Sequence, residues 1–555
     1  MQMAESQQLL ENFKLTVSEK EDYGDCSTNV ALFLSQHIEK NPQEIAETIK
    51  KALEDDPEVN FVQKIEIAGP GFINFWIKDE TLISDLNLYA TGDFKLSPYS
   101  QFRGKKVLLE YAHPNTHKEM HIGHMRTLIT GEALARLLEA SGAEVFRANY
   151  QGDIGPHVAK ALYGIKKIMA EKKLTLDEIA KRSARDKAHF LGEGYVRGNT
   201  EYEKAEREID ALNAELYAGT SPDQKLYAIT REWSLAYYDE FYKRFYTKFD
   251  RLFFESEMVE GGKKIIQEHL GKIFIKDQGA LIFPGEKYNL HRRVFITKRG
   301  NLTYEGKEMA NAYAQYAAFQ FNNKIHVVAH EQAGYFEVVF KALELIDPKQ
   351  FGGLQRHLAM GMVNLTERKM SSRTGEILTV DWLIDEVKKR VHALAKERKF
   401  ESEETVEAVT IGAIKYSVLK VATGTDVAFN IEKSVSLAGD SGPYIQYTYA
   451  RTCSVIEKAK KQTAVQQKKL EPAERALILA LNQFENVATA AADSLSPNIV
   501  AAYIFELAQH FNLFYQKHQI IGTEFEGMRI ALTKAVGTVL REGLDLLGIK
   551  APERM

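Results

Sequence analysis

A β-α-β pattern in residues 106–150 constrains the fold more than any other feature of this chain. Lys106–Tyr111 is a short apolar run of the kind found in a strand buried inside a parallel sheet. A helical pattern follows from about Gly123 to Ala140, and a second β-type run covers Ala143–Tyr150. These three segments have the usual length of a parallel β-α-β unit, so they predict an α/β fold with a doubly wound parallel sheet.

The predicted sheet is interrupted and then resumes. Residues 155–270 are mostly helical and charged, so we interpret them as an insertion between two halves of the sheet. An aromatic stripe within this insertion is typical of helix packing. Its members are Trp233, Tyr237, Tyr238, Phe241, Tyr242 and Phe245. Strand patterns then return at Ala280–Phe283, Arg293–Thr297, Ile325–Ala329 and His357–Val363. Residues 100–379 are therefore expected to form a Rossmann-type core.

The two ends of the chain differ from this core. Residues 1–99 alternate helical and strand patterns, which predicts a separate α+β domain. From residue 380 to residue 555 we expect an all-α domain without strands. The helical patterns there cover 381–398, 403–422, 443–461, 471–493, 497–517 and 526–547.

Composition excludes several classes of protein. The two cysteines, Cys26 and Cys453, cannot build a disulfide framework or a cysteine-based zinc site. No run of about 18 apolar residues is present, and no secretory signal is visible, so we expect a cytoplasmic protein without a membrane span. A net charge of −4 argues against indiscriminate binding of polyanions such as DNA, although local basic patches can still bind nucleic acid.

The first informative motif is His113-Pro-Asn-Thr-His-Lys-Glu-Met-His121-Ile-Gly-His124, between the first predicted strand and the following helix. Ligands of open α/β folds bind at the carboxyl ends of strands, near helix N-termini. His121 and His124 lie three positions apart and face the same way, so they can donate hydrogen bonds to phosphate oxygens. Gly123 leaves room for a flat ring such as adenine. The alternative, in which these histidines only cap the helix, is less favoured for a pair than for one histidine.

The second motif is Lys369-Met-Ser-Ser372-Arg373-Thr-Gly375. Glycine-flanked loops with basic and hydroxyl side chains suit the closing of a phosphate site. Alone this motif is weak, because four common residues recur by chance. When it follows the first motif in the same chain, with an interrupted parallel sheet between them, the pair is a strong signal of a nucleotide-binding site.

Together the two motifs resemble those of class I aminoacyl-tRNA synthetases, and further segments resemble the arginyl-tRNA synthetase family. The resemblance runs in order from about residue 15 to the last residue. The segments are Gly24-Asp25…Asn29, Gly69-Pro-Gly-Phe72-Ile-Asn74, Arg147–Gly155, Phe249–Ser256, Tyr304–Glu308, Glu331-Gln332, Gly439–Tyr447 and Leu546–Met555.

The resemblance implies a two-step reaction with ATP as a substrate and Mg²⁺ accompanying it. Arginine attacks the α-phosphate of ATP to form arginyl-adenylate and pyrophosphate, and the terminal ribose of tRNA then takes the arginyl group and releases AMP. The implied ATP-binding residues are His113, Asn115, His121, Gly123, His124, Lys369, Met370, Ser371 and Ser372. His121, His124 and Lys369 would be catalytic. The class signature usually ends in a second lysine where this chain has Ser372, and either Arg373 or Lys118 would supply the missing cation.

The resemblance also implies a pocket for the arginine guanidinium, a planar cation that needs acceptors in a matching plane. Its residues would be Asn115, Asn149, Glu255, Tyr304, Glu308 and Gln332. Lysine would reach one of the two carboxylates but not both in that plane. The family more often has Asp at the position of Glu308, so this pocket must differ slightly or Glu308 must tilt.

The implied partners are tRNA(Arg), L-arginine and ATP, and we expect a monomer. The C-terminal helices resemble an anticodon-binding domain in which Tyr444, Tyr447 and Arg451 would contact tRNA. Asn29 and Phe72, in a domain that resembles the family's N-terminal addition, would contact the tRNA elbow. The lysines between residues 458 and 469 are more typical of a solvated helix face than of a phosphate-binding surface.

Two alternatives stay open. The chain could be a class I synthetase for another amino acid, although two isolated cysteines disfavour a cysteine enzyme with its zinc site, and Glu255 and Glu308 disfavour glutamate. It could also be a paralogue that binds tRNA without charging it. The presence of His121, His124 and Lys369 argues against that second alternative.

Overall fold

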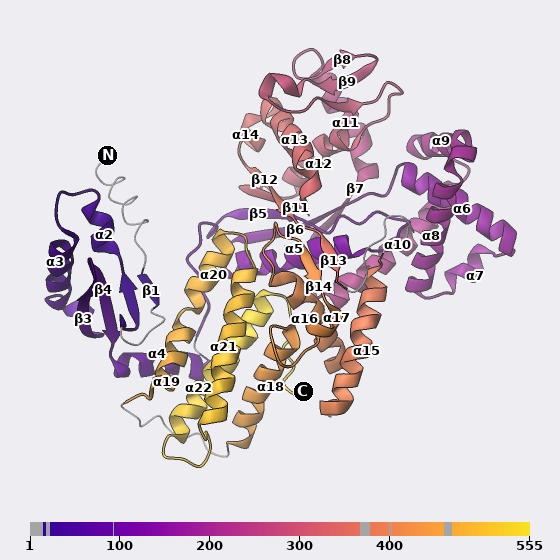
Figure 1. Ribbon diagram of the computed structural model, residues 1–555. Coiled ribbons are helices and arrows are strands. Elements are labelled where there is room, and N and C mark those ends of the chain that lie inside the picture. Colours follow the sequence, from indigo (N-terminus) through magenta and orange to yellow (C-terminus); the bar gives the residue numbers. More distant parts are fainter. Residues whose placement is uncertain are drawn as a thin grey trace. The chain divides into compact units, whose positions relative to one another are not determined.

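The computed structural model describes the chain in segments (Figure 1). They are residues 15–17, 23–92, 94–366, 378–398, 400, 402–459 and 469–555. The chain divides into two compact units. The first unit consists of Met1–Lys95, Arg451–Phe484 and Glu506–Leu540. The second consists of Leu96–Ala450, Glu485–Phe505 and Arg541–Met555.

The second unit contains a five-stranded sheet in which every neighbouring pair is parallel, in the order β12-β11-β5-β6-β7. The strands are β5 (Lys106–Glu110), β6 (Glu144–Gln151), β7 (Arg251–Phe254), β11 (Asn323–Ala329) and β12 (Gln355–Met360). The predicted doubly wound α/β core is confirmed. The strand of this sheet that comes first in the sequence, β5, is central. The next strands, β6 and β7, lie on one side of it, and the later strands, β11 and β12, lie on the other, so the strand order reverses between β5 and β11.

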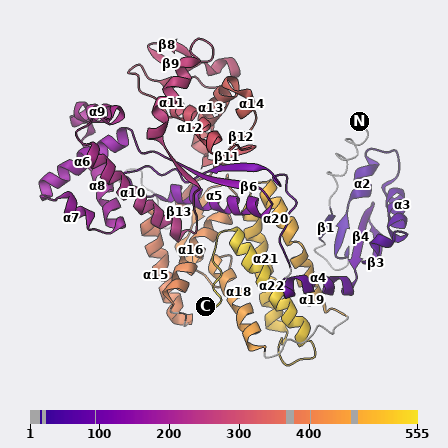
Figure 2. The same cartoon turned by 180° about the vertical axis from the view of Figure 1, so that it is seen from behind.

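Helices cover both faces of this sheet, which explains the unbroken apolar run of β5. Leu108 faces a core shared with Met309 of α12 (Tyr304–Ala318) and Val339 of α13 (Ala333–Ile346). Alternation turns Val107 and Leu109 toward the opposite face, where α5 (Ile122–Ala140) packs against the sheet. The two views show α12 and α13 on one side of the sheet and α5 on the other (Figures 1 and 2).

Two of the predicted strands do not belong to the parallel sheet. β9 (Ala280–Phe283) and β10 (Arg293–Ile296) pair antiparallel with each other, and β8 (Ile275–Asp277) completes a separate three-stranded sheet. The prediction that the core sheet resumes at residue 280 is therefore wrong. Only nine residues connect β9 to β10, and a parallel connection needs a crossover of roughly a dozen or more.

The predicted insertion is helical, but it ends earlier than predicted, because β7 lies within residues 155–270. Its helices are α6 (Pro156–Lys172), α7 (Leu176–Ala180), α8 (Ala184–Thr200), α9 (Tyr202–Ala218) and α10 (Gln224–Arg244). The aromatic stripe on and just after α10 is buried, which confirms its role in helix packing. After β7 the chain continues into α11 (Glu255–Glu268).

The N-terminal part of the first unit is α+β, as predicted. An antiparallel sheet has the order β1-β2-β4-β3. Its strands are β1 (Leu15–Val17), β2 (Cys26–Thr28), β3 (Val62–Ala68) and β4 (Phe72–Ile77). The accompanying helices are α2 (Val30–Ser35), α3 (Pro42–Glu54) and α4 (Asp79–Thr91). Within this unit the Arg475 guanidinium pairs with the carboxylates of Asp25 and Asp79.

The described residues of the C-terminal region are mainly helical, and one strand lies among them. Its longer helices are α15 (Val380–Arg398), α16 (Glu403–Leu419), α18 (Gly442–Lys458), α19 (Pro472–Asn482), α20 (Phe484–Asp493), α21 (Asn498–Lys517) and α22 (Glu526–Leu546). The strand is β14 (Val427–Phe429), which pairs in parallel with β13 (Val363–Leu365) and contradicts the prediction of an uninterrupted helical region. Three residues carry too little alternation to reveal such a strand.

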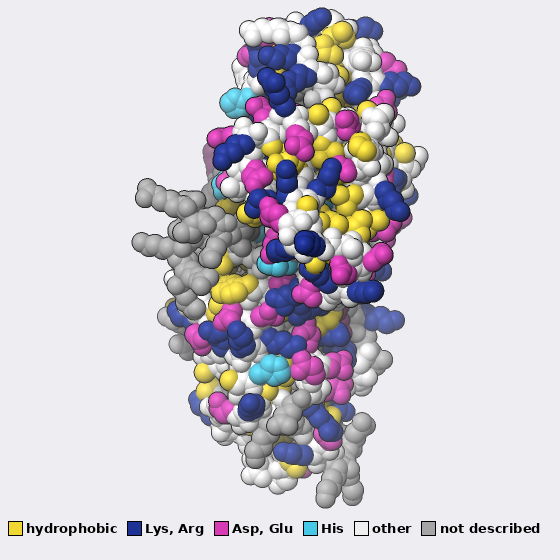
Figure 3. Space-filling view, turned by 90° about the vertical axis from the view of Figure 1, so that its right-hand side faces the viewer, with side chains coloured by type: hydrophobic (Ala, Val, Ile, Leu, Met, Phe, Trp, Pro, Cys, Tyr) yellow, Lys and Arg dark blue, Asp and Glu magenta, His cyan; other side chains and the backbone are white. Residues whose placement is uncertain are grey.

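The described helices include none with the length and apolar composition that a membrane crossing requires. On the face drawn in Figure 3, Lys and Arg side chains are interspersed with Asp and Glu. Mixed charge of this kind agrees with the small net charge of the sequence.

Candidate functional site

The candidate site begins at the carboxyl end of β5, beside the point where strand order reverses, and ligands of doubly wound sheets bind at such a point. The loop after β5 holds three non-glycine residues with positive φ: Ala112 (80°), His113 (51°) and His117 (63°). Strained backbone of this kind persists where surrounding structure enforces it, and it clusters at functional sites. Here the loop is held by a bridge between Asn115 and Gly152.

His121 caps the helix that follows this loop. Its Nδ1 accepts hydrogen bonds from the backbone N–H groups of Gly123 (3.1 Å) and His124 (3.3 Å). Because Nδ1 is an acceptor, the ring proton lies on Nε2, which leaves His121 with one N–H available to a ligand. The capping role that the sequence offered as an alternative therefore exists, and it orients the ring as a donor.

The His124 ring stacks on that of His121, with centroids 3.6 Å apart. Burial lowers the pKa of both imidazoles, that of His121 to about 4, and the charge of Lys118 lowers them further. Both rings are therefore neutral at pH 7. A Cβ on Gly123 would lie 2.9 Å from the His121 ring, so this glycine makes room for the imidazole itself.

The motif His113–His124 contains one cationic side chain, that of Lys118. Its ammonium lies 4.2 Å from the centroid of the Tyr195 ring. Its charge also lowers the pKa of His157, as it does for the two stacked histidines, so it lies among the imidazoles. The residues Lys369, Met370, Ser371, Ser372 and Arg373 lie outside the described part of the chain. The choice between Arg373 and Lys118 as the replacing cation stays a prediction.

Glu255, the first residue of α11, lies close to this loop. Its side chain is nearly buried, and burial raises its pKa. A Cβ on Gly152 would lie 3.6 Å from Glu255 Oε1 and 2.1 Å from Asn115 Oδ1. Gly152 is therefore the point at which the loop after β5 approaches the carboxylate, and the close approach requires glycine.

Asp153 fixes the start of α11. This buried carboxylate accepts hydrogen bonds from Ser256 N (2.9 Å), Ser256 Oγ (2.7 Å) and Arg231 Nε (2.8 Å). A cavity of about 490 Å³ adjoins this cluster on the side of α9 and α10. Arg231 and Ser256 are part of the cavity lining, and the predicted site residues are not. Asp153 thereby positions Glu255 without contacting it.

Lys307 is the ionic partner of Glu255. Thr303 caps α12 through its side chain, and Lys307 lies in the first turn of that helix. The ammonium of Lys307 pairs with Glu255 Oε2 and lies 4.6 Å from the centroid of the Tyr304 ring. Tyr304 itself is 56% exposed.

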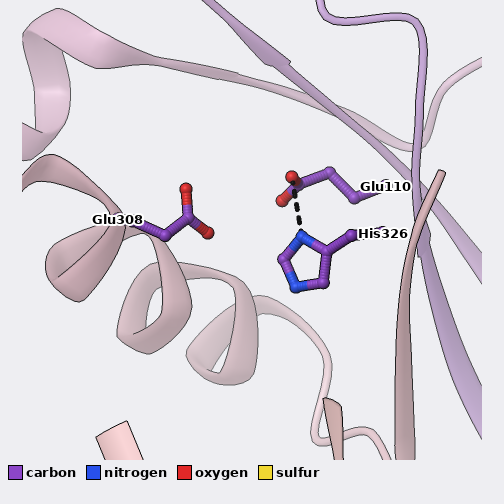
Figure 4. A group of neighbouring side chains, drawn as sticks. All are labelled: Glu110, Glu308 and His326. Carbon is purple, nitrogen blue, oxygen red and sulfur yellow. Dashed lines mark hydrogen bonds and ion pairs between the residues drawn. The ribbon is translucent and has the colours of Figure 1, made fainter. Parts of the chain in front are cut away.

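Glu308 belongs to a second buried group, shown in Figure 4. From α12 its carboxylate faces Glu110 of β5 and His326 of β11. One ligand atom from each of these three residues lies within 4.8 Å of the others. Lys324 Nζ, fully buried, is 3.4 Å from Glu110 and 3.5 Å from Glu308. Burial and the Glu110 charge raise the pKa of Glu308 to about 8.

The three side chains of this group are of types that bind metal ions, but their charge is already compensated. The buried Lys324 ammonium contacts both carboxylates. A divalent cation among them would lie beside that ammonium in a region of low dielectric, which is unfavourable. We therefore assign no metal to this group.

The end of β6 presents polar side chains to both faces of the sheet. Asn149 and Gln151 donate hydrogen bonds to Tyr242 Oη, at 2.9 and 3.1 Å, and their side-chain oxygens are buried without a partner among the described residues. Tyr150 points the other way, and burial together with the charges of Glu255 and Glu308 raises its pKa. Its buried hydroxyl likewise has no described hydrogen-bond partner.

The predicted arginine pocket is thus brought together in part. The charges of Glu255 and Glu308 both raise the pKa of Tyr150. The two carboxylates nevertheless pair with different lysines, Glu255 with Lys307 and Glu308 with Lys324. Asn149 lies on the other face of β6. Gln332, at the end of the short 3₁₀ turn His330–Gln332 after β11, is exposed. No hydrogen bond in the described chain joins its side chain to Glu255 or Glu308.

Sequence reasoning missed several residues of this region, among them Tyr150, Gln151, Lys307 and Lys324. Alternation around Asn149 was the available signal for Gln151, which must share its face. The two lysines carried no local signal, because each is defined by a carboxylate from another part of the chain.

The residues predicted to contact tRNA lie away from these groups in sequence and are structured. Tyr444 and Tyr447 are half-buried on α18. Arg451 pairs with Asn512, and its guanidinium lies 5.1 Å from the centroid of the Tyr515 ring. Asn29 occupies the N-cap position of α2, and Phe72 is exposed at the start of β4. Of the lysines between residues 458 and 469, only the first and last are described.

Comparison with known proteins covers almost the whole chain. Residues 2–77 match the family described as arginyl tRNA synthetase N terminal domain. Residues 93–431 match tRNA synthetases class I (R), catalytic domain, and residues 445–555 match the DALR anticodon binding domain.

Individual relatives agree with these matches. The chain is 31% identical to an arginine–tRNA ligase of Bdellovibrio bacteriovorus, over 97% of this chain and 93% of the relative. It is 29% identical to that of Fusobacterium nucleatum, over 98% and 96%. The structure of arginyl-tRNA synthetase of Thermus thermophilus superimposes with a TM-score of 0.83 at 26% identity, covering 99% of this chain and 98% of that one. This chain belongs to the arginyl-tRNA synthetase family of class I.

Proposed function

We propose that this chain, like the family to which it belongs, ligates L-arginine to tRNA(Arg) in two ATP-dependent steps. The observation that carries the proposal is the close approach at Gly152, where the loop bearing Asn115 meets the buried carboxylate of Glu255. A nucleotide-binding loop and an acceptor for a cation thereby share one edge of the sheet. That arrangement suits a reaction between ATP and a cationic amino acid.

In the first step, a carboxylate oxygen of arginine attacks the α-phosphorus of ATP, and the bond to the bridging oxygen breaks to release pyrophosphate. Little covalent chemistry falls to the protein, so preorganised donors provide most of the stabilisation. We assign this role to the Nε2–H of His121 and to His124, which burial keeps neutral. Lys118, Lys369 and Mg²⁺ bound with ATP would supply positive charge.

Further residues would bind ATP in this proposal. Asn115 and His113 lie on the strained loop that follows β5, and Gly123 begins the helix behind it. Met370, Ser371 and Ser372 would close over the phosphates together with Lys369, as the family pattern implies.

On the arginine side, Glu255 and Glu308 would accept hydrogen bonds from the cationic end of the substrate, and Tyr304 would flank it. The unpartnered oxygen of Asn149 supports a role as an acceptor, because buried polar atoms are rarely left unsatisfied. Asn115 and Gln332 complete the proposed pocket, Gln332 from its exposed position after β11.

In the second step, a ribose hydroxyl at the end of tRNA attacks the carbonyl carbon of arginyl-adenylate, and AMP leaves. Contacts with tRNA are proposed for Tyr444, Tyr447 and Arg451 on the helical side, and for Asn29 and Phe72 on the N-terminal side. The protein is proposed to act as a monomer in the cytoplasm.

Charging of total tRNA with radiolabelled amino acids, in the presence of ATP and Mg²⁺, tests the proposal. We expect arginyl-tRNA and no charging with lysine or glutamate. Charging with another amino acid would identify a different class I synthetase, and tRNA binding without any charging would identify a silent paralogue. ATP–pyrophosphate exchange measured with and without tRNA tests whether adenylate formation depends on tRNA. The family resemblance predicts that it does.

A further inference from the structure

We propose that Lys307 occupies the position of the substrate cation beside Glu255 and that arginine must displace it to bind. The inference rests on the proposed function, because it assigns Glu255 and Tyr304 to the arginine pocket. It concerns a residue that contacts both of them in the structure and that the sequence did not single out.

The contacts of Lys307 are those expected of a bound cation. Its ammonium pairs with the carboxylate of Glu255 and lies 4.6 Å from the centroid of the Tyr304 ring. A carboxylate on one side and an aromatic face on another are the groups that bind a cationic side chain in proteins. The substrate guanidinium would need the same two groups, so Lys307 and arginine compete for them.

Burial explains why the carboxylate of Glu255 needs a cationic partner. Glu255 is 4% exposed, and an ionised carboxylate held away from water without a partner is strongly unfavourable. Lys307, 3% exposed, provides that partner. Its long unbranched side chain can rotate away from Glu255 while the helix stays in place, because Thr303 caps the helix independently.

Competition with Lys307 means that a ligand cation must replace an existing ion pair at Glu255. Free lysine would replace one ammonium–carboxylate pair by another of the same kind and gain nothing at Glu255. Arginine replaces it by a planar group that can form two parallel hydrogen bonds with the carboxylate. The internal lysine therefore weakens the binding of both ligands by the same factor, and the discrimination between them comes from the two parallel hydrogen bonds of the guanidinium.

Two substitutions separate this role from a structural one. Lys307→Met removes the competing cation with little change in volume, so we expect the KM for arginine to fall about tenfold or more, the scale of one hydrogen bond to a charged group. Inhibition by free lysine should strengthen by a similar factor. In Lys307→Arg the new guanidinium can form two hydrogen bonds with Glu255, so it competes more strongly with the substrate. The KM for arginine should therefore rise, with a smaller change in kcat. The assays are run at pH 8.5, because burial raises the pKa of Glu255.

A structural role predicts the reverse order. In that case Lys307→Met raises the KM, because Glu255 has lost its partner, and Lys307→Arg restores it; this result would overturn the inference. Glu305→Gln is the matched control, since Glu305 lies in the same turn and pairs with Arg293. We expect it to leave the KM for arginine unchanged.

Chemical labelling of the unaltered enzyme gives an independent test that does not depend on the folding of a variant. Acetylation of Lys307, followed by mass spectrometry, should increase several-fold when saturating arginine is added. Lys324, fully buried in the neighbouring group, should stay unlabelled and serves as the internal reference. Equal labelling of Lys307 with and without arginine would refute displacement. Failure of the enzyme to charge arginine would instead refute the proposed function.

Discussion

The affinity for arginine should depend on pH through Glu308. Burial and the charge of Glu110 raise its pKa to about 8, so at pH 7 most of the free enzyme carries a proton on this carboxyl. A guanidinium binds the ionised carboxylate, and a raised pKa therefore weakens binding at low pH. As the pH increases through the pKa, the proton no longer competes and the affinity rises.

The size of the effect follows from the ionised fraction. With a pKa of about 8, roughly 9% of Glu308 is ionised at pH 7 and roughly 76% at pH 8.5, a ratio of about eight. The dissociation constant for arginine should fall by roughly that factor, equivalent to about 1 kcal/mol. Burial lowers the pKa of His326, to about 4, and raises those of Tyr150 and Tyr335, so these neighbours keep their protonation state over this range.

Calorimetric titration with arginine, without ATP, measures the effect at pH 7 and pH 8.5. Buffers of different ionisation enthalpy also count the protons released, and we expect close to one per arginine from Glu308 at pH 7. Glu308→Gln should bind arginine more weakly and lose this part of the pH dependence. Any contribution from Glu255, whose pKa burial also raises, remains in both proteins. Identical pH slopes for the wild type and Glu308→Gln would refute the reasoning.

Three further substitutions test other parts of the structure. His124→Ala should slow adenylate formation by about 10²- to 10³-fold, the scale of losing one preorganised donor, and a near-normal rate of ATP–pyrophosphate exchange with tRNA present would exclude this role. Gly152→Ala places a Cβ 2.1 Å from Asn115 Oδ1, so the asparagine must move; we expect the KM for ATP to rise about tenfold or more with unchanged circular dichroism. Arg529→Met removes the guanidinium that pairs with the buried carboxylate of Glu474 and should lower the free energy of local unfolding around α19 by about 3 kcal/mol, whereas unchanged hydrogen exchange there would contradict a stabilising pair.

The elements that a sequence pattern could predict are those with a strong local period. The buried run of β5, the motif after it and the long helix α5 follow from residues within a single stretch. β7 was hidden inside a helical insertion, because four residues are too few to show a period. β9 has the composition of a core strand, and only the short connection to β10 reveals its antiparallel pairing.

The candidate site divides in the same way. His121 and His124 could be predicted because their motif is contiguous, whereas their neutral state depends on burial that only the fold supplies. Glu255 and Glu308 were found through family resemblance, since an isolated glutamate carries no functional signal. Each glutamate is close to its lysine partner only in space. Lys324, the partner of Glu308, lies on β11, whereas Glu308 lies on α12. Lys307 is next to Glu308 in sequence but pairs with Glu255.

The central position of β5 has a consequence for synthesis on the ribosome. Of the five strands of the parallel sheet this one emerges first, and the sheet can grow outward from it, with β6 and β7 added on one side and β11 and β12 later on the other. The histidine-bearing loop thus leaves the ribosome before Glu255, and Glu308 with its neighbours Lys324 and His326 follows later. A nascent chain that stalls between residues 255 and 308 would therefore lack Glu308, one of the two carboxylates proposed to bind arginine, and with it the complete proposed pocket.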